Sequence, residues 1–145
     1  NYSFGIAINN GYTFTGEGGN AISFGSIDPG SSSDEQTTPF WNTGNGVLDA
    51  QTNATNDMSC TTGTISKWNI RYNTTSGNDW SIMANLTADR TQTHAVLYTD
   101  FDLAVSTDYT PPVDPNSDDI YWKLLVPAGA RGTCWAMIEV AAKAG

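Results

Sequence analysis

Apolar residues in this chain recur mainly at every second position, and this period constrains the fold more than any other feature of the sequence. The opening stretch NYSFGIAINNG sets the pattern, because Tyr2, Phe4, Ile6 and Ile8 alternate with small or polar residues. A period of two places alternate side chains on opposite faces of a β-strand. The opening stretch therefore predicts a strand with one face to bury and one flat face.

Short alternating segments separated by Gly, Pro, Asn and Asp continue along the chain, and none has a convincing helical period. Asn45-Gly46 predicts a hairpin between TTPFWN and GVLDAQTNAT, and AGARG predicts a closing hairpin between IYWKLLVP and TCWAMIEVAA. AISFGSI predicts a strand that ends at the turn Asp28-Pro-Gly. We expect an all-β chain with a single Ig-like or jelly-roll-like β-sandwich of roughly nine or ten strands. In this interpretation residues 1–10 form an N-terminal strand and residues 11–145 form the sandwich.

The charge balance argues against several classes of partner. Six Lys and Arg residues stand against fifteen Asp and Glu residues, which gives a net charge of −9 over 145 residues. Phosphate backbones and anionic membrane surfaces would repel such a chain, so we expect no nucleic-acid partner. The apolar runs are shorter than the roughly 20 residues that a membrane span requires, so we expect no membrane span.

Two cysteines, Cys60 and Cys134, are present. An even count favours one disulfide in a secreted protein, and the alternative is two buried free thiols. We favour the disulfide because N-glycosylation sequons also indicate an extracellular protein. The sequence starts directly on a strand without a signal peptide, so we interpret it as a mature, secreted form whose leader has been removed.

Four asparagines, Asn1, Asn53, Asn73 and Asn85, stand in N-x-S/T sequons. Alternation in KWNIRYNTT and WSIMANLTA places Asn73 and Asn85 on the solvent faces of two predicted strands, where glycans could be attached. Asn1 and Asn53 remain open as glycan sites. The buried faces of the same two strands would carry Trp68, Ile70, Tyr72, Trp80, Ile82, Ala84 and Leu86.

No catalytic residues are predicted. His94 is the only histidine, and paired cysteines leave no thiol nucleophile for a Cys-His site. The acidic residues concentrate in loops without a motif that pairs two carboxylates. We therefore expect no enzyme activity and rank a hydrolase that uses loop carboxylates last.

An acidic loop near the end of the chain is a candidate calcium site. Its oxygen ligands would be Asp114, Asn116, Asp118 and Asp119, of which the first three alternate along the chain. The spacing departs from an EF-hand, and the alternative is an acidic turn before a strand. Asp28, Asp34 and Glu35 form a second acidic loop with the same two interpretations.

The five tryptophans divide by strand parity. Trp68, Trp80 and Trp122 have the apolar parity of their strands, so we expect them in the core. The parity of Trp41 leaves its role undecided. Trp135 is opposite in parity to Cys134, and together with Met137 it would form an exposed apolar spot that could contact a partner.

Three stretches, AISFGSIDPGS, FWNTGNGVLDAQTNAT and IYWKLLVPAGARGTCWAMIEVAA, together resemble small secreted β-sandwich subunits. The pattern is common among archaeal surface proteins and is similar to TasA/camelysin-type and archaeal bundling-pilus subunits. It covers about half of the chain, and the motifs are turn patterns. The resemblance implies donor-strand complementation, in which a terminal strand of one subunit completes the sandwich of the next.

Two functions follow as expectations. In the first, the chain is a structural subunit of an extracellular filament, tube or sheath, and copies of itself are its partners. Its opening strand would insert into the next subunit and bury Tyr2, Phe4, Ile6 and Ile8 there. In the second, the chain is a secreted carbohydrate-binding or surface-layer module, and the same strand pairs within its own sandwich. Both arrangements bury the same side chains, so the sequence leaves the choice open.

Overall fold

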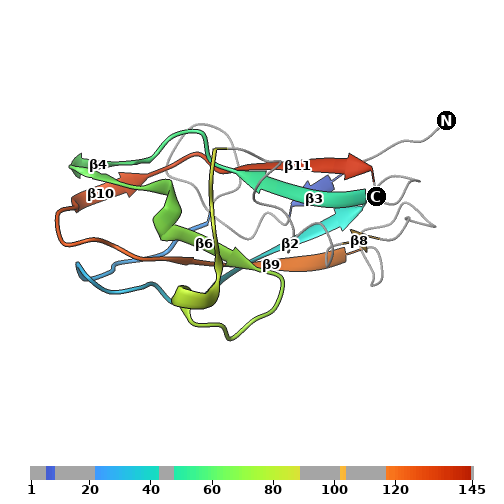
Figure 1. Ribbon diagram of the computed structural model, residues 1–145, viewed down its shortest axis with the longest axis horizontal. Coiled ribbons are helices and arrows are strands. Elements are labelled where there is room, and N and C mark those ends of the chain that lie inside the picture. Colours follow the sequence, from blue (N-terminus) through green and yellow to red (C-terminus); the bar gives the residue numbers. More distant parts are fainter. Residues whose placement is uncertain (1–5, 9–21, 43–47, 89–101, 104–116, 145) are drawn as a thin grey trace.

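The computed structural model in Figure 1 describes residues 6–8, 22–42, 48–88, 102–103 and 117–144. These residues form eleven strands and two short 3-10 helices, and they contain no α-helix. The expected all-β class is confirmed. The strands are β1 (Ile6–Ile8), β2 (Gln36–Asn42), β3 (Leu48–Asn53), β4 (Met58–Thr62), β5 (Thr64–Ile65), β6 (Ile70–Asn73), β7 (Ala84–Asn85), β8 (Asp102–Leu103), β9 (Ser117–Leu124), β10 (Arg131–Trp135) and β11 (Glu139–Ala144), and the 3-10 helices are η1 (Lys67–Asn69) and η2 (Trp80–Ile82).

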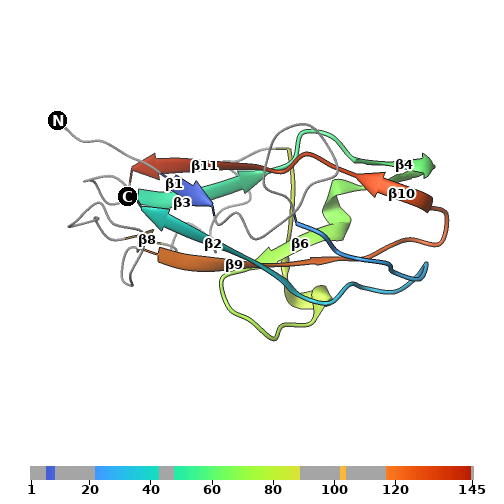
Figure 2. The same cartoon turned by 180° about the vertical axis from the view of Figure 1, so that it is seen from behind.

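The strands form two layers, as expected for a β-sandwich (Figures 1 and 2). One layer is a five-stranded antiparallel sheet with the order β1-β2-β9-β6-β7. The other layer consists of two three-stranded sheets, β10-β4-β5 and β11-β3-β8, which lie end to end. They follow one another because β3 continues into β4 on one side, while β10 continues into β11 on the other.

The core lies between the layers and follows the two-residue period. Alternate residues of β9, namely Ile120, Trp122 and Leu124, are buried, whereas the residues between them are partly exposed. Tyr72 of β6 packs against Trp122 with a ring-centroid distance of 5.9 Å. The opposite layer and its connections contribute Ala50, Ala54, Met58, Ile65 and Ala130 to the same cluster.

A buried polar contact joins the neighbouring strands β2 and β9 within this core. The indole Nε1 of Trp122 donates a hydrogen bond of 2.7 Å to the Oγ1 atom of Thr38, which is itself buried on β2. Burying an indole N–H without a partner would be unfavourable, so Thr38 satisfies the largest side chain of the core.

Both predicted hairpins are wrong. β2 belongs to the five-stranded sheet and β3 to the opposite layer, and β9 and β10 are divided in the same way. The turn at Pro127–Ala130 is present, with a 3.3 Å bond from the Ala130 amide to the Pro127 carbonyl, but the chain leaves it for the other layer. Crossing between layers lets each strand bury its apolar face against the other sheet.

The predicted strand AISFGSI is also wrong, because residues 22–28 have no strand pairing. Its apolar residues Ile22, Phe24 and Ile27 nevertheless pack against the core. The turn that follows is confirmed: the Ser31 amide donates 3.0 Å to the Asp28 carbonyl, and Gly30 has a φ of 88°. Glycine suits this position because side chains disfavour positive φ.

The expected strand WSIMANLTA is replaced at its start by the helix η2, and this changes which side chains are buried. Ile82 is 69% exposed and Met83 is 4% exposed, which reverses the predicted parity. Trp68, which lies in η1, is 61% exposed and is not in the core as expected. A 3-10 helix repeats every three residues, so the period of two fails there. Where strand pairing resumes, Leu86 is buried as predicted.

Candidate functional site

The candidate site is the edge of the five-stranded sheet that carries the opening strand. β1 has three residues and pairs only with β2, so it forms the outermost strand of this sheet among the described elements. Its register pairs are Ile6–Asn42, Ala7–Trp41 and Ile8–Phe40. In this single chain the opening strand therefore pairs with its own sheet.

The register assigns a face to the opening strand. Directly paired residues of an antiparallel sheet share a face, so Ile6 and Ile8 share the face of alternate β2 residues. Thr38 lies on that face and is buried, and its register partner Ile120 is also buried. Ile6 and Ile8 thus stand at the register positions of Asn42 and Phe40, and the burial of their side chains stays a prediction. Tyr2 and Phe4, the other predicted donor residues, lie outside the described residues.

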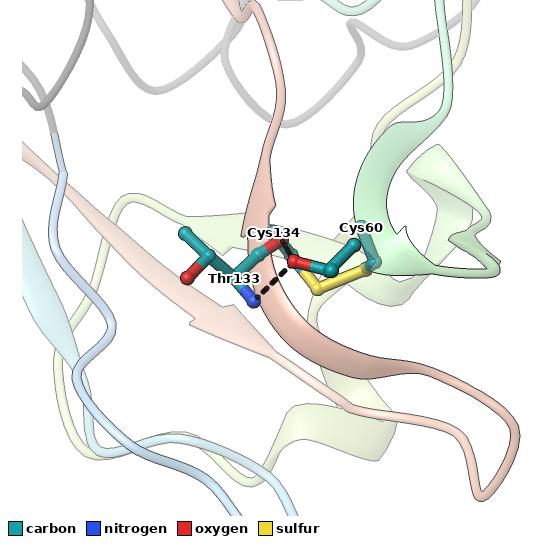
Figure 3. Close-up of a disulfide and its surroundings, with 4 residues drawn as sticks. Cys60, Thr133 and Cys134 are labelled. Carbon is teal, nitrogen blue, oxygen red and sulfur yellow. Dashed lines mark hydrogen bonds between the residues drawn. A yellow bond between two sulfur atoms is a disulfide. The ribbon is translucent and has the colours of Figure 1, made fainter.

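The predicted disulfide between Cys60 and Cys134 is confirmed (Figure 3). The two residues are direct register partners on β4 and β10, with their Cα atoms 3.9 Å apart. The bridge therefore joins two strands of the same layer.

A β-bulge lies beside the disulfide. The register shifts by one residue between Arg131 and Cys134, and Gly132 within this interval has a φ of 84°. The Thr61 hydroxyl accepts a 3.1 Å bond from the Thr133 amide, so it substitutes for a ladder partner where the strands lose register. A glycine with positive φ is the usual first residue of such a bulge.

The three sequons within the described residues have different environments. Asn73 ends β6 and Asn85 ends β7, and both side chains are partly exposed. Asn53 ends β3 and is 3% exposed, and its Nδ2 donates 3.3 Å to the Ala88 carbonyl. Asn1 lies outside the described residues.

The loop between the two exposed sequons is fastened to the outer face of the five-stranded sheet, away from β3 and β11 (Figure 1). Arg71 donates hydrogen bonds to the carbonyls of Trp80 (3.1 Å) and Ser81 (2.8 Å), and its guanidinium lies 3.8 Å from the Trp80 ring centroid. Lys123 donates 2.6 Å to the Asn78 carbonyl. Two cations of the sheet thus hold this loop. The sequence analysis did not predict this arrangement. Its signal was that Arg71 and Lys123 each stand between two buried residues of a strand, which places both cations on the outer face of the sheet.

The predicted calcium site falls only partly within the described residues. Asp114 and Asn116 lie outside them, while Asp118 and Asp119 belong to β9. In the part of the chain that the structure describes, no three His, Cys, Asp or Glu side chains are grouped as a metal site. In the second acidic loop, Glu35 accepts a 2.9 Å bond from the Gly77 amide and so helps to hold the loop after β6. His94 also lies outside the described residues.

The tryptophans are distributed differently from the prediction. Trp122 is fully buried as expected, Trp80 is partly exposed beside Arg71, and Trp68 is exposed. Trp135 and Met137 are 59% and 58% exposed, so both side chains lie at the surface as expected. Trp135 pairs in register with Ser59, which in turn pairs with Thr64. Two hydroxyl residues, Ser59 and Thr64, therefore lie in register beside Trp135 on this outer face.

One ion pair was not predicted. Lys67 and Asp57 meet at 2.9 Å, and the Lys67 backbone amide also donates 3.0 Å to the same carboxylate oxygen. That backbone bond, and then the ammonium, lower the pKa of Asp57 below that of an ordinary aspartate. Since the carboxylate is largely exposed, the pair contributes little to stability.

Comparison of the chain with protein-family models, with characterised proteins and with solved structures found no match in any of the three. Among the residues placed in the structure, no helix has the length and apolar character needed to cross a membrane.

Proposed function

We propose that this chain is a structural subunit of an extracellular filament, tube or sheath. Copies of the chain polymerise head-to-tail, each inserting its opening strand along β2 of the next copy. The observation that carries this proposal is the position of β1, a three-residue strand at the edge of its sheet, which pairs with β2 alone among the strands that the structure describes.

Such a strand can be exchanged between copies with little change in contacts. An identical strand from a neighbouring chain makes the same backbone hydrogen bonds with residues 40–42 in the same register. Exchange of an identical element is a low-cost route to assembly. The donated strand and the accepting edge are different surfaces, so this contact is heterologous and propagates along a polymer.

An extracellular location accompanies the proposal. The disulfide is stable in oxidising surroundings, as found outside the cell. Only 14% of the residues are charged, below the roughly 25% of typical soluble domains, and Asn, Thr, Ser and Gly supply much of the polar character instead. Both features suit a secreted β-sandwich.

Deletion of residues 1–10 tests the proposal. The full chain should form filaments or tubes in negative-stain electron microscopy, and the shortened chain should remain as single particles. A synthetic peptide of residues 1–10 should bind the shortened chain, while the same peptide with Ile6→Asp and Ile8→Asp should not. Polymers of the shortened chain would contradict the mechanism.

A second variant covers the case in which the shortened chain fails to fold. The full chain with Ile6→Asp and Ile8→Asp retains all backbone groups of β1 but cannot bury two charged side chains in the acceptor. It should give a folded circular-dichroism spectrum and no polymer. Polymers of normal length from this variant would refute strand donation.

The exposed tryptophans favour a second candidate function, a secreted carbohydrate-binding or surface-layer module. Trp68 and Trp135 are more than half exposed, and exposed aromatic rings can stack on sugars. This function predicts a monomeric protein whose tryptophan fluorescence changes with soluble glycans, with the response lost in Trp135→Ala. A monomer without such a response would exclude it.

A further inference from the structure

The fold sorts the sequons by access to solvent. Asn53 is 3% exposed, and its Nδ2, the atom to which a glycan would be joined, donates a hydrogen bond to the Ala88 carbonyl. The neighbouring Ala54 amide also donates 3.0 Å to the Thr87 carbonyl, so this part of β3 packs against the chain after β7. A sugar at Asn53 would separate these two segments.

Asn73 and Asn85 have the opposite environment. The Oδ1 of Asn73 accepts a 2.8 Å bond from the Thr74 amide, which leaves its Nδ2 available. Within the described ranges, neither the Nδ2 of Asn73 nor the side chain of Asn85 has a further hydrogen-bond partner, and neither is a buried unsatisfied group. Both side chains are partly exposed.

The two asparagines share the outer face of the five-stranded sheet. Ile70 and Tyr72 point into the core with 0% exposure, so Arg71 and Asn73 lie on the opposite face. Asn85 is the register partner of Arg71 and therefore lies on that face too. The two sequons are diagonal neighbours on adjacent strands, about 7–8 Å apart at this spacing.

The loop that joins the sequons is fixed on the same face. Residues 74–84 run from one sequon to the other, and the hydrogen bonds from Arg71 and Lys123 hold their carbonyls against the sheet. Glycans at the two ends would therefore flank a loop of fixed position on a solvent-facing surface, without entering the core.

We propose that Asn73 and Asn85 carry N-linked glycans, that Asn53 does not, and that the outer face of β6 and β7 is a glycan-covered surface. In each transfer the Nδ2 atom loses a proton and forms a bond to C1 of a sugar. The C1–oxygen bond to a lipid-linked phosphate or diphosphate donor breaks, and the lipid phosphate leaves. The proposal shares the extracellular location with the proposed function but does not require polymerisation.

Mass spectrometry of the secreted full chain tests this proposal. The chain is produced in a glycosylating eukaryotic cell with Ser3→Ala, which removes the sequon at Asn1. Peptide N-glycosidase in H₂¹⁸O then converts each formerly glycosylated asparagine to ¹⁸O-labelled aspartate. We expect the label at Asn73 and Asn85 and none at Asn53.

Matched variants separate the sites. Asn73→Gln and Asn85→Gln should each lower the mass of the intact protein by one glycan, and the double variant should carry none. Thr55→Ala removes the third sequon through an exposed residue, so it should leave the glycan mass unchanged. Label at Asn53 in the folded, secreted protein, or absence of label at Asn73 and Asn85, would overturn the proposal whatever the state of assembly.

Discussion

Replacement of both Cys60 and Cys134 by alanine should lower the free energy of unfolding by about 4.5 kcal/mol. The disulfide joins residues separated by 74 positions, and a cross-link of this span removes about 15 cal/mol/K of chain entropy from the unfolded state. For a chain of 145 residues the same loss corresponds to a fall in Tm of about 10–20 °C. The bond links strands that already pair in the folded layer, so we expect the native sheet to remain.

Urea unfolding followed by tryptophan fluorescence provides the assay. At a slope of about 2 kcal/mol/M, the midpoint should fall by about 2 M. Wild-type protein reduced with a thiol reagent is the matched control, because it loses the cross-link and keeps both partly buried cysteine side chains packed against the core. A midpoint shift below about 0.5 M in the reduced wild type, or about 1 kcal/mol, would refute the chain-entropy reasoning.

Three further predictions concern the core and the bulge. Gly132→Ala should lower the free energy of unfolding by about 2–3 kcal/mol, because the added Cβ would lie 2.6 Å from the Thr61 Cβ at a positive φ. Thr38→Val should cost about 1–3 kcal/mol, since the Trp122 Nε1 loses its buried acceptor. Burial raises the pKa of Tyr72, so its contribution to stability should be complete below about pH 10 and decrease as the pH rises further, as urea midpoints between pH 8 and 11 would show.

Each of these has a matched comparison. Gly25 also has a positive φ, but no atom lies within 4 Å of an added Cβ, so Gly25→Ala should lower the free energy of unfolding by only about 1 kcal/mol. Equal losses of stability in Gly25→Ala and Gly132→Ala would contradict the steric argument. Thr38→Ser keeps the hydroxyl and should be the milder change of the two at that position. Tyr72→Phe should remove the part of the decrease in stability at high pH that ionisation of this phenol causes. An unchanged dependence of the urea midpoint on pH would assign that decrease to other groups.

Local sequence patterns predicted the features that depend on near neighbours. The alternation in β9 identified Trp122 as a core residue, and Asp28-Pro-Gly identified a turn, in which the structure gives Gly30 a positive φ. The pairing of Cys60 with Cys134 followed from number and expected compartment, because only one intramolecular pairing was available. The first two predictions needed only a short stretch of sequence, and the third needed only the fact that two cysteines can pair in one way.

The failures concern choices that are not local. Asn45-Gly46 favours a reversal, but it does not determine whether the next strand joins the same sheet or the opposite layer. The helix η2 ends the alternation at Trp80 because Arg71, nine positions earlier, holds its carbonyls. Asn53 is buried because Ala88 lies beside it, a contact across 35 positions that no sequon pattern reveals.

Strand donation between copies is the central claim, and cross-linking across the β1–β2 register measures it most directly. Ile8 and Phe40 are register partners, so cysteines at these two positions can form a disulfide. One chain carries Ile8→Cys and a second chain, distinguished by mass, carries Phe40→Cys. The two chains are mixed before assembly and then oxidised. Ser59→Cys, on the opposite layer, replaces Phe40→Cys in the control. Donation predicts a disulfide between the two chains with Phe40→Cys and none with Ser59→Cys. Absence of the interchain bond, together with an intrachain bond when both Ile8→Cys and Phe40→Cys are in one chain, would contradict the account.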